Sequence, residues 1–205
     1  MSFDEIIDRR GTHSNKWDDM EQLFGVSATD GLAMWTADMD FRAPPCIRDA
    51  LGAVHAQGIY GYYGNKAPYL NAICWWMQNR HGWAVRPEWI HTTNGLVNGV
   101  AICLDAFSSP GDGIVMFTPI YHSFYRVIRA AERVPVECEM ALVDGRYQLD
   151  FATYDAQMTG TERMLILCSP HNPGGRVWSR SELMAIAAFA KRHDLMLPIA
   201  RQSKS

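Results

Sequence analysis

A run of apolar residues that leads into an asparagine–proline turn constrains the fold of this chain more than any other feature. Residues 164–168, Met-Leu-Ile-Leu-Cys, are typical of a fully buried strand, and the turn at Asn172 follows shortly after. Ser179 and Glu182 have the spacing of a capping box, which predicts a helix that runs to about residue 193. Ligands bind beyond the carboxyl ends of strands in open α/β sheets, so the Asn172 amide is a candidate ligand contact. An ordinary Asn-Pro loop turn explains this stretch alone equally well.

Predicted strands alternate with predicted helices along most of the chain. We expect helices at residues 44–57, 69–81, 96–107, 123–131 and 150–158, and strands at residues 89–93, 114–117, 134–139 and 164–168. Asp144-Gly145 predicts a hairpin turn. This alternation predicts a largely parallel sheet that helices cover on both faces.

Composition and charge argue against several classes of protein. The chain has 205 residues, of which 48% are hydrophobic and 20% charged, and these values are ordinary for a globular protein. Its net charge of −3 gives no strong attraction to nucleic acid or to anionic membranes. No apolar run is long enough to cross a bilayer, and the acidic start Met-Ser-Phe-Asp-Glu is not a signal peptide. We therefore expect no nucleic-acid or membrane partner.

The five cysteines predict a reduced protein. They are odd in number, scattered along the chain and mostly placed within apolar patterns. No Cys-x-x-Cys or His-Glu-x-x-His pair suggests a metal site. We therefore expect buried free thiols rather than disulfides, and a cytoplasmic location.

Two further turns fall where a ligand would bind. Residues 93–97, Thr-Asn-Gly-Leu-Val, place a turn at a helix start, where free N–H groups suit a phosphate; a plain βα loop explains this pentapeptide better on its own. Tyr121 follows the strand at residues 114–117, and its ring can cover a flat cofactor or simply pack as an aromatic. The absence of Gly-x-Gly-x-x-Gly, Walker and Gly-x-Ser-x-Gly strings argues against the common nucleotide and serine hydrolase sites.

Taken together, eight segments in order resemble the aminotransferase class I/II superfamily, the fold-type I enzymes that use pyridoxal 5′-phosphate (PLP). The strings Trp-Thr-Ala-Asp-Met-Asp-Phe and His-Asn-Pro-Gly-Gly-Arg-Val-Trp point to its MalY/PatB branch, the cystathionine β-lyase-like C–S lyases. The resemblance implies the PLP-dependent transferase fold, a three-layer α/β/α arrangement with a mainly parallel sheet. The segments are residues 7–12 with 16–18, then 35–41, 60–62, 80–83, 87–90, 110–112, 118–121 and 168–178.

The resemblance also implies how this chain would hold PLP. Backbone N–H groups at the start of the helix at residues 96–107 hold the phosphate, a tyrosine ring stacks on the pyridine, and an asparagine hydrogen-bonds the phenolic oxygen. A second tyrosine reaches the phosphate of the neighbouring subunit, because the family's sites form in a homodimer. The implied cofactor-binding residues are Gly95, Leu96, Val97, Tyr121, Asn172 and, across the dimer, Tyr62.

The implied substrate is an amino acid, with Trp35, Met39 and Asp40 placed near it. PLP acts as an electron sink for the α-carbanion of such a substrate. Loss of a β-thiolate gives C–S cleavage to pyruvate and ammonia, whereas reprotonation at the cofactor gives transamination. A C–S β-lyase is the first expectation, and an aminotransferase of the same superfamily is the alternative.

The resemblance breaks after Leu197. The aspartate that pairs with the pyridinium nitrogen in the family would fall at Ala200, and the later Schiff-base lysine and carboxylate-binding arginine are absent. Lys204 lies in no family motif, so the chain offers no catalytic residue of its own. We therefore expect the N-terminal part of such an enzyme, truncated or frameshifted after Leu197; an inert or partner-binding product is the non-catalytic alternative.

The resemblance divides the chain into three parts. Residues 1–45 are expected to form an N-terminal arm and part of the small domain. Residues 46–197 are expected to form the first part of the large PLP-binding domain, and residues 198–205 an aberrant tail.

Overall fold

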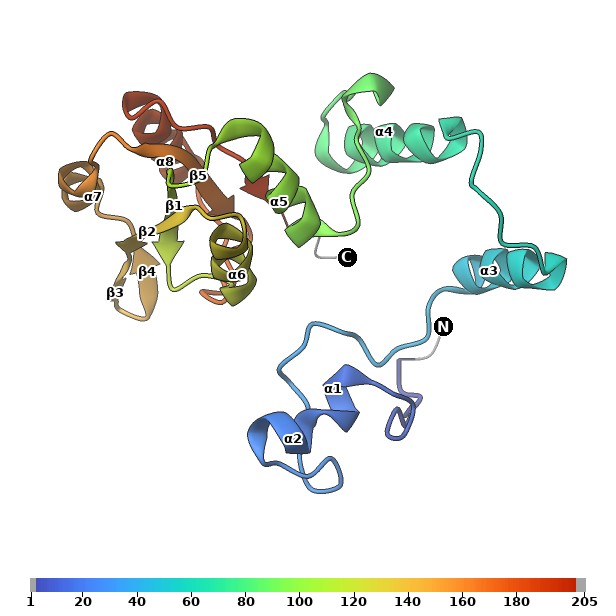
Figure 1. Cartoon of the computed structure of the whole chain (residues 1–205). Coiled ribbons are helices and arrows are strands. Elements are labelled where there is room, and N and C mark those ends of the chain that lie inside the picture. Colours follow the sequence, from blue (N-terminus) through green and yellow to red (C-terminus); the bar gives the residue numbers. More distant parts are fainter. Residues whose placement is uncertain (1–2, 202–205) are drawn as a thin grey trace. The chain divides into compact units, whose positions relative to one another are not determined.

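The structure, a computed structural model, describes residues 3–201 in two compact units (Figure 1). The first unit ends at Ile73, and the second begins at Cys74. Lys204, which lies in no family motif and was given no catalytic role above, lies outside the described residues.

A parallel sheet forms the centre of the second unit. Within residues 74–201 it has four strands in the order β2-β1-β5-β6, and every neighbouring pair is parallel. Val115 of β1 lies opposite Val136 of β2 on one side and Leu165 of β5 on the other. The strands are β1 (Gly113–Thr118), β2 (Val134–Glu139), β5 (Glu162–Cys168) and β6 (Ile199–Ala200).

Helices cover both faces of this sheet, as the sequence predicts. Successive residues of a strand point to opposite faces: Val115 and Phe117 join one buried cluster, whereas Ile114 and Met116 join the other. The first cluster is closed by α7 (Phe151–Gln157) and α8 (Arg180–Arg192), and the second by α5 (Leu96–Phe107) and α6 (His122–Ala130) (Figure 1). The expected three-layer α/β/α fold is therefore confirmed.

Local signals placed most elements of the second unit correctly. The hairpin of β3 (Ala141–Val143) and β4 (Arg146–Gln148) turns at Asp144 and Gly145, whose φ angles of 50° and 74° are those of a tight hairpin turn. The capping box at the start of α8 is also confirmed: Ser179 Oγ accepts from the Glu182 N–H, and Glu182 accepts in return from the Ser179 N–H.

The strand expected at residues 89–93 is wrong. A 3₁₀ helix, η1 (Pro87–Trp89), occupies its start, and no described residue pairs with the segment that follows as a strand would. The N–H of Ile90 bonds back to the carbonyl of Pro87, and the Arg86 guanidinium lies 4.4 Å from the Trp89 ring centroid. These local contacts take the place of the hydrogen bonds that residues 89–93 would need from a neighbouring strand.

The sheet continues past Leu197, the residue after which the family resemblance breaks. Residues 198–205 were expected to form an aberrant tail, but Ile199 and Ala200 form β6. Pro198 has no N–H to donate, and its carbonyl instead accepts from the N–H of Leu167 at 3.0 Å. Because β6 is the outermost strand of the described sheet, a proline beside it is tolerated.

The first unit contains short helices and long connections. Its helices are α1 (Asn15–Asp18), α2 (Met20–Phe24) and α3 (Pro45–Gln57), and α4 (Ala67–His81) crosses the division between the units. The predicted apolar face of α3 is present, but Ile47, Leu51 and Val54 are all exposed. Helical periodicity therefore predicted the position of α3 in the chain correctly, but its apolar face is not buried in a core.

The cysteine expectation holds only in part. All five cysteines are free thiols, but only Cys138 and Cys168 are buried, while Cys46 is exposed. Within residues 3–201, none of the helices is both long and apolar enough to span a bilayer.

Candidate functional site

Two predicted cofactor contacts lie in turns that follow neighbouring strands. Tyr121 is the N-cap of α6 and comes shortly after β1, and Asn172 comes shortly after β5. Because β1 and β5 pair in parallel, both turns lie at the carboxyl edge of the sheet. This is the edge at which open α/β sheets bind ligands.

The start of α5 offers backbone donors that no side chain caps. Its N-cap is Gly95, with a φ of 88° that favours glycine. A Cβ added there would meet no heavy atom within 4 Å, so the space beside this residue is open. The N–H groups of Leu96 and Val97 belong to the first helical turn, which has no intrahelical acceptors. Such donors, at the positive end of the helix dipole, suit a phosphate.

Packing places the start of α5 at the same edge of the sheet. Leu96 and Tyr121 pack against one buried cluster, which includes Cys168 and Ala200. Cys168 ends β5 and Ala200 ends β6, so both mark the carboxyl edge. The structure therefore gathers residues 95–97, Tyr121 and Asn172 in one region of the second unit.

Asn172 and Tyr121 present polar and aromatic groups at this edge. Asn172 is half-buried, and among the described residues its side-chain amide has no hydrogen-bond partner. The Tyr121 ring meets the rings of His122 and Phe124 edge-on, with centroids 5.0 and 5.6 Å away. These aromatic contacts help to fix the position of the Tyr121 ring.

A buried histidine ties the two turns together. His171 is 3% exposed, and its Nε2 lies 2.8 Å from the carbonyl oxygen of Pro119, which belongs to the Tyr121 turn. Burial lowers the pKa of the His171 imidazole, and the nearby Arg176 guanidinium adds to this effect. The imidazole is therefore neutral at physiological pH.

Trp178 also holds the Asn172 turn in place, through contacts with His171 and Cys168. Its ring meets the His171 ring edge-on at 5.4 Å, and its Nε1 donates to the Cys168 carbonyl at 2.9 Å. The Arg176 guanidinium covers the Trp178 ring at 4.3 Å. The backbone closes the turn as well, because the His171 N–H donates to the Arg176 carbonyl at 2.7 Å.

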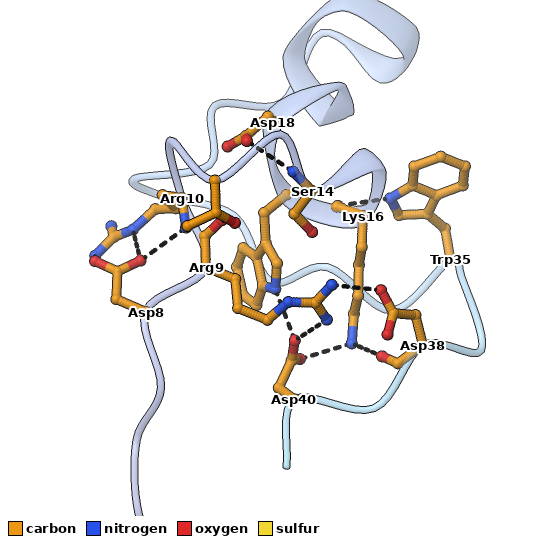
Figure 2. Close-up of polar contacts among 11 residues, drawn as sticks. Asp8, Arg9, Arg10, Ser14, Lys16, Asp18, Trp35, Asp38 and Asp40 are labelled. Atoms are coloured by element: carbon orange, nitrogen blue, oxygen red, sulfur yellow. Dashed lines mark hydrogen bonds and ion pairs between the residues drawn. The ribbon is translucent and has the colours of Figure 1, made fainter. Parts of the chain in front are cut away.

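The predicted substrate residues lie in the first unit, in a loop held by ion pairs. The Asp40 carboxylate accepts from three donors, with Lys16 Nζ at 2.7 Å, Arg9 Nη1 at 2.9 Å and Trp17 Nε1 at 3.0 Å. Figure 2 shows the Lys16 and Arg9 side chains directed at this carboxylate. The Arg9 guanidinium also pairs with Asp38 at 2.6 Å. We call these five residues the Asp40 network.

The Asp40 network fixes the loop rather than leaving its carboxylate free. Hydrogen bonds from Lys16 above all, then from Trp17 and Arg9, lower the pKa of Asp40 to about 2. Trp35 joins the arrangement because its Nε1 donates to the Lys16 carbonyl at 3.0 Å. Met39 lies between the two anchored aspartates with 64% of its surface exposed. The side chain of Met39, not the carboxylate of Asp40, is thus the group that this loop leaves free.

Tyr62 stands apart from these groups. It lies between α3 and α4 in the first unit, and its side chain is fully exposed, with no partner among the residues described. Within residues 3–201, no group of three or more His, Cys, Asp or Glu side chains is arranged to hold a metal ion.

Sequence comparison assigns the family. Residues 32–199 match the family described as aminotransferase class I and II. The chain belongs to this family. It is 41% identical over 196 residues to cystathionine β-lyase PatB of Bacillus subtilis, covering 95% of this chain and 50% of PatB. It is 33% identical over 199 residues to the protein MalY of Escherichia coli, with coverage of 95% and 50%.

Structural comparison agrees with this assignment. The crystal structure of cystalysin from Treponema denticola, which contains a pyridoxal 5′-phosphate cofactor, matches with a TM-score of 0.89 and 34% identity. That match covers 97% of this chain and 50% of cystalysin. The family and the fold predicted from the sequence are thus confirmed, and the chain spans about half the length of these relatives.

Three residues of the site were not singled out from the sequence. Lys16 and Arg9 hold the Asp40 network, and His171 joins the two cofactor turns. All three lie inside segments that carried the family resemblance, residues 7–12, 16–18 and 168–178. The resemblance marked these positions without assigning them a role, because their partners lie far along the chain.

Proposed function

We propose that this chain forms the N-terminal portion of a PLP-dependent C–S β-lyase that acts on cystathionine or related cysteine conjugates. The observation that carries the proposal is the meeting of three features at one sheet edge: the uncapped start of α5, the Tyr121 turn and the Asn172 turn. Amide donors, an aromatic face and a free carboxamide match a ligand that combines a phosphate, a flat ring and a phenolic oxygen.

Each of these features has one task in the proposed site. The N–H groups of Leu96 and Val97 hold the phosphate, the Tyr121 ring covers one face of the cofactor and excludes water there, and the Asn172 amide donates to the phenolic oxygen. When bound, PLP supplies an electron sink that stabilises negative charge at the α-carbon of an amino acid. In the first unit, the loop of Trp35 and Met39 contributes contacts to that substrate.

The described residues provide contacts for the phosphate and the phenolic oxygen of PLP, but not for its pyridinium nitrogen or its aldehyde. Ala200 is 2% exposed at the end of β6, where the family resemblance implies an aspartate for the pyridinium nitrogen. Lys191, the one lysine of the second unit within residues 74–201, lies in the last turn of α8. We therefore expect these 205 residues to contact PLP without anchoring it covalently.

The relatives favour elimination over amino transfer. PatB carries the name cystathionine β-lyase. The proposed reaction breaks the bond between Cβ and sulfur and releases a thiol, and the remaining aminoacrylate hydrolyses to pyruvate and ammonia. The alternative is transfer of the amino group to a 2-oxo acid, which the family name supports. We further propose a cytoplasmic homodimer in which Tyr62 reaches the partner's phosphate site.

Cofactor binding is tested first on the 205-residue chain. Titration with PLP and with pyridoxal, followed by tryptophan fluorescence, should show PLP binding at least about tenfold tighter, because hydrogen bonds to a charged group contribute about 1.5–3 kcal/mol. Gly95→Ala should weaken PLP binding. Gly111→Ala is the matched control, because its φ of 89° imposes the same strain as the 88° of Gly95 in a turn that follows α5. Equal binding of both ligands, or equal effects of both substitutions, contradicts the proposed site.

The reaction is tested by adding the C-terminal half of a relative. Co-expression with the C-terminal half of PatB, with that half alone as a control, allows pyruvate and thiol release from cystathionine to be compared with amino transfer to a 2-oxo acid. We expect elimination to be the faster reaction. Faster amino transfer would favour the aminotransferase alternative, and neither activity in a complex that binds PLP would favour the non-catalytic one.

A further inference from the structure

The His171 side chain lies between two turns that the proposed function uses. Its ring is 3% exposed, packed edge-on against Trp178, and its Nε2 is 2.8 Å from the Pro119 carbonyl oxygen. His171 directly precedes Asn172, and Pro119 lies two residues before Tyr121. One hydrogen bond therefore joins the side chain next to Asn172, the proposed oxygen donor, to the backbone near Tyr121, the proposed ring-stacking residue.

The partners of the ring determine which nitrogen carries the proton. A carbonyl oxygen only accepts hydrogen bonds, so Nε2 must carry the hydrogen. The other nitrogen, Nδ1, is buried and has no hydrogen-bond partner among the described residues. A proton on Nδ1 would charge the ring in this buried site, close to the Arg176 guanidinium; burial outweighs the opposing effect of the Pro119 and Cys168 backbone, so the pKa of His171 is lowered. The contacts thus specify the neutral imidazole protonated on Nε2.

We propose that His171 is a positioning residue: as a neutral Nε2–H imidazole it clasps the Tyr121 turn to the Asn172 turn and so sets the spacing of the two PLP contacts. This inference rests on the proposed function. It assigns His171 no contact with PLP, and it leaves the start of α5 untouched, because none of its contacts involves that helix.

Glycine at position 174 makes room for this ring. A Cβ added to Gly174 would lie 2.8 Å from Cδ2 of His171, which is closer than real Cβ contacts come, and 3.1 Å from Cδ2 of Tyr147, which is tighter than most of them. The φ of Gly174 is not in the left-handed region, so alanine there is a steric probe rather than a source of backbone strain. Gly52, which has open space around it, provides the matched Gly→Ala control.

The first experiment reads the protonation state directly and needs no cofactor. Two-bond ¹⁵N–¹H NMR spectra of the 205-residue chain at pH 7 distinguish the two neutral tautomers from the imidazolium, and the His171 signal is assigned by its loss in His171→Gln. We expect the Nε2–H tautomer, and Gly174→Ala should shift that signal whereas Gly52→Ala should not. A His171 ring that is protonated on Nδ1, or charged, overturns the proposed positioning role even if PLP binds as proposed.

The second experiment separates positioning from general stability. His171→Gln keeps an N–H four bonds from Cα, as Nε2 is, whereas the amide nitrogen of His171→Asn is one bond too short to reach Pro119. We expect His171→Asn to bind PLP about five- to tenfold more weakly, the loss of one hydrogen bond, while His171→Gln retains most of the affinity. Affinity for inorganic phosphate should stay the same in both variants, because the start of α5 is unchanged.

The outcomes distinguish the two proposals. Equal losses of PLP and phosphate affinity in His171→Asn, or equal PLP affinity in the Gln and Asn variants, overturn the positioning role. If the unsubstituted chain binds phosphate but shows no preference for PLP, the proposed function fails while the tautomer measurement still decides the clasp. Circular dichroism of each variant identifies any that fails to fold, and Gly174→Ala then serves as the second binding probe.

Discussion

The two units of this chain hold their candidate site residues by different physical means. In the second unit, Tyr121 and Asn172 follow strands whose side chains are almost completely removed from water. In the first unit, Trp35 and Met39 lie in a loop that ion pairs hold, and the buried residues of that unit are Ser14, Lys16, Met20 and Ala33 among those described.

The difference predicts which disturbance each unit resists. Buried apolar side chains neither titrate nor lose attraction through ionic screening, so the stability of the second unit depends chiefly on how well its core is filled. Partly exposed ion pairs are weakened by salt and by protonation, so the loop of the first unit depends on solution conditions. The candidate residues of the second unit thus have a packed support, and those of the first unit an electrostatic one.

The largest expected effect comes from a matched pair of isoleucines, one in each unit. Ile166 in β5 is 0% exposed and Ile47 in α3 is 49% exposed. Ile166→Ala should lower the free energy of unfolding by about 2–5 kcal/mol through lost burial and a cavity, whereas Ile47→Ala should change it by about 0.5 kcal/mol or less. Urea unfolding measures both values. Similar losses at the two positions would show that the α3 face is buried in solution.

A smaller effect should follow from acidification of the second unit. The pKa of His171 is lowered in the folded chain by burial, so the unfolded chain binds more protons as the pH falls below about 6.5. The stability that the neutral ring contributes is present above that value and is lost as the pH falls toward the folded pKa, by at most about 1.4 kcal/mol for each pH unit. Urea midpoints between pH 7.5 and 5 test this, with His171→Gln expected to be flatter over the same range.

The smallest expected effect is local to the first unit. The Nε1–H of Trp17 donates to the Asp40 carboxylate, and the Nε1–H of Trp178 donates to a backbone carbonyl. Because the pKa of Asp40 is lowered to about 2, its contribution is present above pH 3.8 and is lost as the pH falls through 2. The indole N–H NMR signal of Trp17 should move between pH 4 and 2, and that of Trp178 should not. A coincident change in both signals would mean global unfolding instead.

Local sequence patterns were sufficient for much of the second unit. The helix at residues 96–107 and the strand at residues 134–139 have the predicted bounds, because periodicity and turn residues act within a few positions. The prediction of a strand at residues 89–93 was wrong because residues that favour strands form one only where a neighbouring strand pairs with them. β6 was missed for the converse reason, since its pairing with β5 outweighs the presence of Pro198.

The candidate site divides along the same line. The turns at Tyr121 and Asn172 and the helix start at Gly95 could be found from the sequence, because each joins a strand or a turn to an element with its own local signal. The state of Asp40 could not, because its partners Arg9 and Lys16 lie 31 and 24 residues away and no periodic pattern links them.

Sequence alone determined the family, the alternation of strands and helices, and the turns at which we propose contacts with a cofactor. The three-dimensional structure decided which polar groups already have partners. The ionised Asp40 carboxylate is paired with Lys16 and Arg9, and the His171 ring is directed at the carbonyl of Pro119, 52 positions earlier in the chain. The physical reason is range. Helix periodicity, caps and turns are set by neighbours in sequence, whereas a hydrogen bond or an ion pair depends only on distance in space.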